Sequence, residues 1–377
     1  MAYRLEKQEP IGVGLRRIAV ECADAIAQQV TDETVDRDKA VHNARKSCKR
    51  LRAALRLLRD GVGTAVFQRE NTRIRDVSRL LGTARDSYVL LETLTALEQQ
   101  YPDALPAPLV ADAHMYLAQR YEQALQQLLT QDSAIDEVLQ RVRAARKRLA
   151  KLPVDKMKFT VAARSLRRVY RCGRRAFVAA YAAESGAHAF HEWRKWVKYL
   201  WYEMEIMQDL WPALLLPLAD ELHTLSGYLG DDHDLAELRR VALHDPSMAS
   251  VADVPLLLDL IARRRAELQT AAHPLGQRIF AERPRIFVQR LATYWQAWQM
   301  DAELVLQTVS DSRVVETAVT PLQERLFTTG QAAAFANLSV EQVRSLIDEG
   351  KLAAFKLGGS WVIEKEALAQ WMGDGGG

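Results

Sequence analysis

Apolar residues recur every three or four positions over most of residues 15–298, which is the spacing of an amphipathic helix. The helices expected on this basis are residues 15–30, 41–58, 67–97 with a break at Gly82, 109–129, 133–149, 161–181, 189–207, and 256–298 with breaks at Pro274 and Pro284. No segment before residue 300 alternates apolar and polar residues as a half-buried strand does. The pattern therefore predicts an all-α domain over residues 1–300.

The helix expected at residues 41–58 has one apolar face and one face that is almost only basic. Its apolar residues are Ala44, Cys48, Leu51, Leu55 and Leu58. The basic arc, about 120° wide, consists of His42, Arg45, Lys46, Lys49 and Arg56, with Arg52 at its edge. Like charges at this spacing destabilise an isolated helix by about 0.2–0.5 kcal/mol per pair. A solvated face usually interleaves acids, so we interpret this arc as a site for a polyanion.

The helix expected at residues 161–181 repeats this design. Its basic arc consists of Arg164, Arg167, Arg168, Arg171 and Arg175, with Arg174 at its edge. Charge is segregated along the chain: residues 37–59 hold nine Lys or Arg and one acid, and residues 141–175 hold fourteen and one. The whole chain carries only +3, so the remainder is acidic. We expect an electropositive region on an otherwise acidic molecule.

The rest of the composition fits a cytoplasmic protein with no membrane association. No apolar run reaches the roughly 20 residues of a membrane span, and the first ten residues, MAYRLEKQEP, lack the apolar segment of a signal peptide. Cys22, Cys48 and Cys172 lie in helical patterns and are expected to be reduced packing residues.

An internal repeat relates the two halves of this domain. Residues 40–58, AVHNARKSCKRLRAALRLL, align with residues 189–207, AFHEWRKWVKYLWYEMEIM, and LLGTARD at 80–86 aligns with YLGDDHD at 228–234. The second copy is less basic, because Tyr199, Trp201 and Glu205 replace three arginines. A repeat this long is no solenoid unit and predicts two related helical bundles.

Two other kinds of site compete with a polyanion site. Paired histidines could bind a metal, but lysines and arginines surround them, and DDHD at residues 231–234 is the nearest approach to a ligand cluster. Catalysis is the other alternative. The chain has no Walker-type phosphate loop, no nucleophile elbow and no H-E-x-x-H motif. We therefore expect no metal, no cofactor and no enzymatic activity.

The motifs HNARKSCKRLR and HEWRKWVKYLW, each followed by LGTARD or LGDDHD, resemble the CHAD family, the conserved-histidine α-helical domain. The resemblance covers roughly residues 3–300. It implies two four-helix bundles related by a pseudo-twofold axis, with basic helices around a central cavity. It also implies non-catalytic binding of inorganic polyphosphate and an association with polyphosphate granules.

Carried over to matching positions, the resemblance and the basic arcs give one set of expected polyphosphate-binding residues. They are His42, Arg45, Lys46, Lys49, Arg52, Arg56, Arg164, Arg168, Arg171, Arg175, His191, Arg194, Lys195 and Lys198. The departures at Tyr199, Trp201 and Glu205 leave open how far the second half contributes.

Residues 326–373 resemble an excisionase-type, MerR-like winged helix-turn-helix. We expect helices at 331–336 and 340–349 capped by Thr328-Thr329 and Ser339, a two-strand wing at 355–363 and a closing helix at 364–372. Residues 301–325 are expected to be a linker and residues 374–377 a flexible glycine-rich tail.

The role of this C-terminal module stays open between DNA and a protein partner. Its net charge is −1, whereas DNA-binding domains are usually basic. The candidate DNA-contacting residues are Gln342, Arg344, Ser345 and Lys356. The main alternative to a simple polyphosphate-binding protein is therefore a DNA-binding regulator that responds to polyphosphate, located at the nucleoid rather than at granules.

Overall fold

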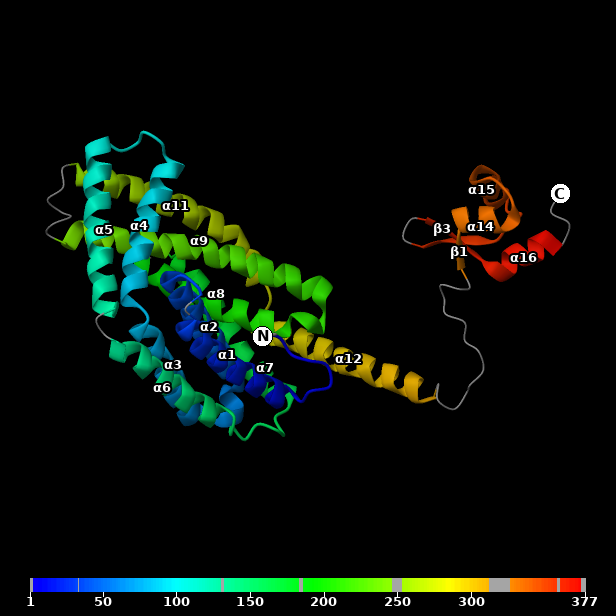
Figure 1. Ribbon diagram of the computed structural model, residues 1–377, viewed down its shortest axis with the longest axis horizontal. Helices are drawn as coiled ribbons and strands as arrows, with labels where there is room; N and C mark the ends of the chain where they lie inside the picture. The colour runs from blue at the N-terminus through cyan, green and yellow to red at the C-terminus, as the bar shows by residue number, and fades with distance from the viewer. Residues whose placement is uncertain are drawn as a thin grey trace. The chain divides into compact units, whose positions relative to one another are not determined.

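The computed structural model describes residues 3–32, 34–129, 132–182, 186–245, 253–311, 326–357 and 360–373. The chain divides into two compact units, Met1–Leu304 and Val305–Gly377, and each is described by itself. The first unit contains the long helices α1 to α12, and the second contains the small three-stranded sheet and its short helices (Figure 1).

The helices of the first unit form two sets in matching order. The first set comprises α1 (Ile11–Thr31), α2 (Arg37–Val62), α3 (Thr64–Leu80), α4 (Thr83–Gln100), α5 (Ala107–Leu129) and α6 (Asp132–Leu149). The second set comprises α7 (Phe159–Ala180), α8 (Ala187–Met207), the 3-10 helix η1 (Gln208–Leu210), α9 (Pro212–His244), α11 (Val254–Ile279) and α12 (Pro284–Asp311). Each helix of the second set begins about 150 residues after its counterpart. Helix α9 corresponds to α3 and α4 together. The predicted all-α architecture is confirmed.

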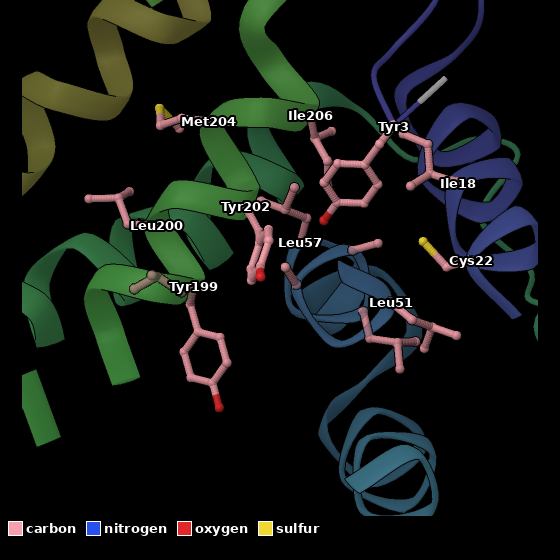
Figure 2. Packing of buried hydrophobic residues seen from close by; sticks show 14 of the residues in the cluster. Tyr3, Ile18, Cys22, Leu51, Leu57, Tyr199, Leu200, Tyr202, Met204 and Ile206 are labelled. Carbon is pink, nitrogen blue, oxygen red and sulfur yellow. The ribbon is translucent and has the colours of Figure 1, made fainter. Parts of the chain in front are cut away.

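The two sets share one large hydrophobic core. Helix α2 contacts α1, α3, α7 and α8, so its apolar residues are enclosed by helices of both sets. Figure 2 shows Cys22 of α1, Leu51 and Leu57 of α2, and Tyr202 and Ile206 of α8 meeting in this core. A second, smaller cluster forms where α4 and α5 pack with the C-terminal half of α9 and the N-terminal half of α11. The two predicted bundles are therefore joined rather than separate.

One predicted helix break is wrong. The sequence predicts a break at Pro274, but α11 continues through it to Ile279. A proline in a helix interior costs about 3 kcal/mol, because it removes a backbone hydrogen bond. Packing outweighs this cost here. Leu275 is buried, and a Cβ on Gly276 would come within 2.7 Å of the side chains of Phe177 and Trp193. The tight approach of α11 to α7 and α8 keeps the helix continuous.

The first unit extends to Leu304, past the boundary predicted at residue 300, and α12 continues beyond it to Asp311. The rest of the predicted linker, residues 312–325, and the predicted tail, residues 374–377, lie outside the described residues. None of the helices in the described part of the chain is long and apolar enough to span a bilayer.

The second unit has the predicted order of a winged helix-turn-helix. Its elements are β1 (Leu326–Thr328), α14 (Thr329–Ala336), α15 (Val340–Asp348), β2 (Ala354–Leu357), β3 (Ser360–Glu364) and α16 (Lys365–Gly373). Capping boxes at Thr328 and Ser339 start α14 and α15 as predicted, and Gly350 takes a φ of 72° after α15. Strand β1 is an addition: it pairs antiparallel with β3 and is too short to show strand periodicity.

Candidate anion-binding cavity

A cavity of about 900 Å³ lies against the basic face of α2 and is lined mainly by α2, α3, α4, α8 and α9. Its lining contains ten Lys or Arg residues and four Asp or Glu residues. The cations are Arg45, Lys46, Lys49, Arg52, Arg75, Arg79, Arg120, Arg194, Lys198 and Arg240. The acids are Asp86, Asp231, Asp234 and Glu237. This excess of positive charge in a concave site favours an anionic ligand.

The junction between α3 and α4 positions Arg45 in the cavity. Its guanidinium donates to the carbonyl oxygen of Ser78 at 3.3 Å and to the carboxylate of Asp86 at 3.0 Å. Gly82 makes this possible, because a Cβ there would come within 2.6 Å of the guanidinium. The LGTARD motif therefore provides both the space and the carboxylate that hold Arg45.

The second helix set has the same residue types at the equivalent positions. Arg194, Gly230 and Asp234 occupy the positions that correspond to Arg45, Gly82 and Asp86, and all three line the cavity. The Nε of Arg194 is buried, and it has no hydrogen-bond partner among the described residues. A buried guanidinium nitrogen without an acceptor is costly, and an anion in the cavity would supply that acceptor.

Lys49 and Lys198 are the equivalent lysines of α2 and α8, and both line the cavity. Neither forms an ion pair within the described part of the chain. Burial, together with the nearby charges of Arg194 and Arg45, lowers the pKa of Lys49 to about 8. Burial and the charges of Arg194 and Lys49 hold the pKa of Lys198 well below its usual value. A bound anion would relieve this repulsion and favour both charged lysines.

The histidines near the cavity are placed differently in the two sets. His42 lines the cavity, whereas His191 lies beside it, with its Nδ1 3.3 Å from the Nδ1 of His233. Burial, with the charge of Arg194, lowers the pKa of His233 to about 3, and the same two causes lower the pKa of His191. His233 is therefore neutral near pH 7.

Half of the predicted polyphosphate-binding residues line this cavity. They are His42, Arg45, Lys46, Lys49, Arg52, Arg194 and Lys198. The structure does not bring the other half into its lining: Arg56, Arg164, Arg168, Arg171, Arg175, His191 and Lys195.

Two of the residues outside the lining are engaged elsewhere. The guanidinium of Arg56 lies 3.6 Å from the ring centre of Tyr199, because two further turns of α2 carry position 56 away from Lys49. The ammonium group of Lys195 donates to Glu192 at 2.7 Å.

The basic face of α7 points away from the cavity lining. Arg168 forms an ion pair with Asp60 at 3.1 Å. Arg164, Arg171 and Arg175 are exposed and form no ion pair within the described residues. Helix α7 packs its apolar face against α2 and α8, so its arginines form a separate outer row.

Several lining residues were not among the predicted ones. Arg75 and Arg79 come from α3, where their i,i+4 spacing could have shown a shared face. Asp86 and Asp234 follow from the repeated LGTARD and LGDDHD motifs. Arg120 of α5 and Arg240 at the end of α9 have no local pattern that would point to the cavity.

The DDHD segment, which is the nearest approach to a metal-ligand cluster in the sequence, lies at this cavity. Asp231, His233 and Asp234 of the DDHD segment all line it, yet the described residues contain no group of three or more acids, histidines or cysteines that could hold a metal ion.

The candidate DNA-contacting residues of the second unit are largely used within it. The side-chain oxygen of Gln342 accepts a hydrogen bond from the backbone of Ser339, and the hydroxyl of Ser345 donates to Glu349. Arg344 is exposed on α15. Lys356 lies in β2, and its side chain is outside the described part of the structure.

Comparison with known proteins agrees with these observations. The CHAD domain family matches residues 17–243, and a helix-turn-helix domain family of the excisionase type matches residues 326–375. The structure is similar to the CHAD domain from the plant Ricinus communis, with a TM-score of 0.51, 20% identity, and coverage of 74% of this chain and 95% of that one. It is also similar to PptA from Streptomyces chartreusis, with a TM-score of 0.50, 17% identity, and coverage of 73% and 100%. None of the curated proteins compared with the chain matches it significantly.

Proposed function

Because this chain belongs to the CHAD domain family, we propose that its cavity binds inorganic polyphosphate and does not transform it. The observation that carries the proposal is the pair of matching cationic groups, Arg45 with Lys49 and Arg194 with Lys198, in one cavity. Polyphosphate carries about one charge per phosphate and presents acceptor oxygens along its whole length. Arginine forks bind phosphate oxygens in pairs, and lysines add compact point charges.

A binding role is favoured over catalysis by the balance of charge in the lining. The four carboxylates are surrounded by ten cations, and Asp86 is already paired with Arg45. A hydrolytic site for polyphosphate would need carboxylates free to hold a divalent metal. The cationic lining instead matches the phosphate oxygens directly, and polyphosphate granules are the expected location.

The second unit is proposed to recruit a protein partner rather than to recognise a DNA sequence. Two of its four candidate contacts, Gln342 and Ser345, satisfy hydrogen bonds inside α15 and its cap. The net charge of −1 over residues 326–373 also disfavours contact with phosphates. If the full chain shifts a duplex DNA probe and Arg344→Ala abolishes the shift, a DNA-binding regulator is the better description.

The polyphosphate proposal is tested with the variant Lys49→Gln/Lys198→Gln. We expect its affinity for long-chain polyphosphate to fall at least tenfold, because two charge-assisted contacts of about 1.5–3 kcal/mol each are lost. The matched control, Lys151→Gln/Lys156→Gln, removes two exposed lysines outside the cavity and should bind as the wild type does. Equal affinity of the two double variants would contradict a cavity site.

A further inference from the structure

The two helix sets contribute different chemistry to the cavity although they are equivalent. In the first set, Arg52 of α2 and Arg75 of α3 line the cavity, and the charge of Arg75 lies close enough to lower the pKa of Arg52. The repeat places Trp201 and His223 at the corresponding positions of α8 and α9. At these equivalent positions the first set is therefore cationic and the second is aromatic.

The aromatic side chains of the second set form a stack of three rings: Tyr202, Trp201 and His223. The ring centres of Trp201 and Tyr202 are 4.6 Å apart with planes at 23°, and those of Trp201 and His223 are 4.5 Å apart at 27°. All three residues line the cavity, and His223 is exposed at the end of the stack. The position that corresponds to Tyr202 in the first set is Ala53, which offers no ring.

Space is open beside this stack. Gly227 lies one turn after His223 on α9 and also lines the cavity. The repeat places Arg79 at the corresponding position of the first set. A Cβ on Gly227 would meet no atom within 4 Å. Where the first set has the large cation Arg79, the second set therefore has open space beside its aromatic rings.

We propose that the cavity takes a nucleoside polyphosphate, with the phosphates on the lysine and arginine groups and the base stacked on His223. This inference rests on the proposed function, because it uses the same phosphate contacts. Lys198 lies one turn before the ring stack on α8, about 5 Å along the helix axis. A nucleotide can therefore place its base at the ring stack and its phosphate chain at Lys198. A plain phosphate chain would contact the cations of both sets and leave the rings unused.

Calorimetric titration of the full chain with tripolyphosphate and with ATP, both in magnesium-free buffer, separates these cases. We expect ATP to bind about tenfold more tightly, since stacking of a base on an aromatic side chain contributes about 1–3 kcal/mol. His223→Ala changes an exposed side chain and should reduce ATP affinity to that of tripolyphosphate. Gly227→Arg introduces the residue type that the first set has at the equivalent position. It should strengthen the binding of tripolyphosphate and weaken the binding of ATP.

Trp211→Leu is the control, because Trp211 is 46% exposed and lies outside the cavity. It should leave the preference for ATP unchanged. Equal or tighter binding of tripolyphosphate by the wild type would overturn the nucleotide inference and leave the polyphosphate function standing. Binding of ATP that depends on His223, without any binding of tripolyphosphate, would show that the base alone holds the nucleotide, and it would contradict the phosphate contacts on which both proposals rest. If neither ATP nor tripolyphosphate binds, both the nucleotide inference and the polyphosphate function are overturned.

Discussion

Lys49 shows how a proposed binding residue can oppose folding. Its ammonium group is partly buried beside Arg45 and Arg194, and its pKa is lowered to about 8. The unfolded chain, in which a lysine has a pKa near 10.4, therefore binds more protons than the folded protein between about pH 8 and pH 10.5. Stability contributed through this group rises with pH in that interval, because the folded state is penalised only while the lysine is charged.

Replacing Lys49 by methionine is accordingly expected to stabilise the protein while weakening polyphosphate binding. The variant keeps an unbranched side chain that is one atom shorter and removes a charge that is repelled by its neighbours. At pH 7 its melting temperature should be a few degrees above that of the wild type, and the difference should shrink above pH 8. Thermal unfolding followed by circular dichroism at pH 7 and pH 10 measures both effects. A lower melting temperature at pH 7 would contradict the repulsion inferred for this site.

Gly82 and Gly230 occupy equivalent positions but have different surroundings. A Cβ on Gly82 would come within 2.9 Å of the carbonyl oxygen of Arg79 and 2.6 Å of the guanidinium of Arg45, whereas a Cβ on Gly230 would meet nothing within 4 Å. The chain breaks between α3 and α4 at the first glycine and continues through α9 at the second.

Alanine at these two positions should therefore have opposite effects on the free energy of unfolding. Gly82→Ala is expected to lower it by about 1–3 kcal/mol through overpacking. Gly230→Ala is expected to raise it by up to about 1 kcal/mol, because alanine is favoured over glycine inside a helix. Urea denaturation of both variants makes the comparison. Equal effects would show that the α3–α4 junction is not constrained by Arg45.

The outer arginine row of α7 provides a test at the level of a whole element. Arg164, Arg171 and Arg175 are exposed on one helix face outside the cavity lining. A polymer longer than the cavity has phosphates outside it that can reach such a row, whereas all the phosphates of a short chain lie within the cavity.

The triple variant Arg164→Gln/Arg171→Gln/Arg175→Gln is expected to weaken binding of long-chain polyphosphate several-fold through loss of counterion release. It should leave tripolyphosphate affinity unchanged. Competitive titration with the two chain lengths gives both values. A matching loss for tripolyphosphate would mean that α7 contributes to the cavity site itself.

The sequence predicts most helices because their apolar stripes are regular, and it predicts the basic face of α2 because charge there is one-sided. It could not predict where the equally basic face of α7 points, since a helical pattern defines a face but not its neighbours. The same limit applies to Arg56, which packs on Tyr199, a residue brought near only by the fold. The break predicted at Pro274 fails for a related reason, because tertiary packing of α11 outweighs the local cost.

At the scale of the molecule, the two helix sets give one cavity with a shared cationic centre. The equivalence of Arg45 with Arg194 and of Lys49 with Lys198 could be read from the internal repeat. Their convergence on one cavity depends on how α2 packs against α8 within a common core, which no local pattern records.

On this account the cationic cavity is specific for phosphate chains. The most direct measurement is a titration of the full chain with long-chain polyphosphate at several salt concentrations, with duplex DNA as competitor. We expect tight binding whose affinity falls as salt rises and which excess DNA does not displace. Displacement by DNA at comparable phosphate concentrations would mean that the basic helices act as an open nucleic-acid surface, and it would contradict the cavity as the binding site.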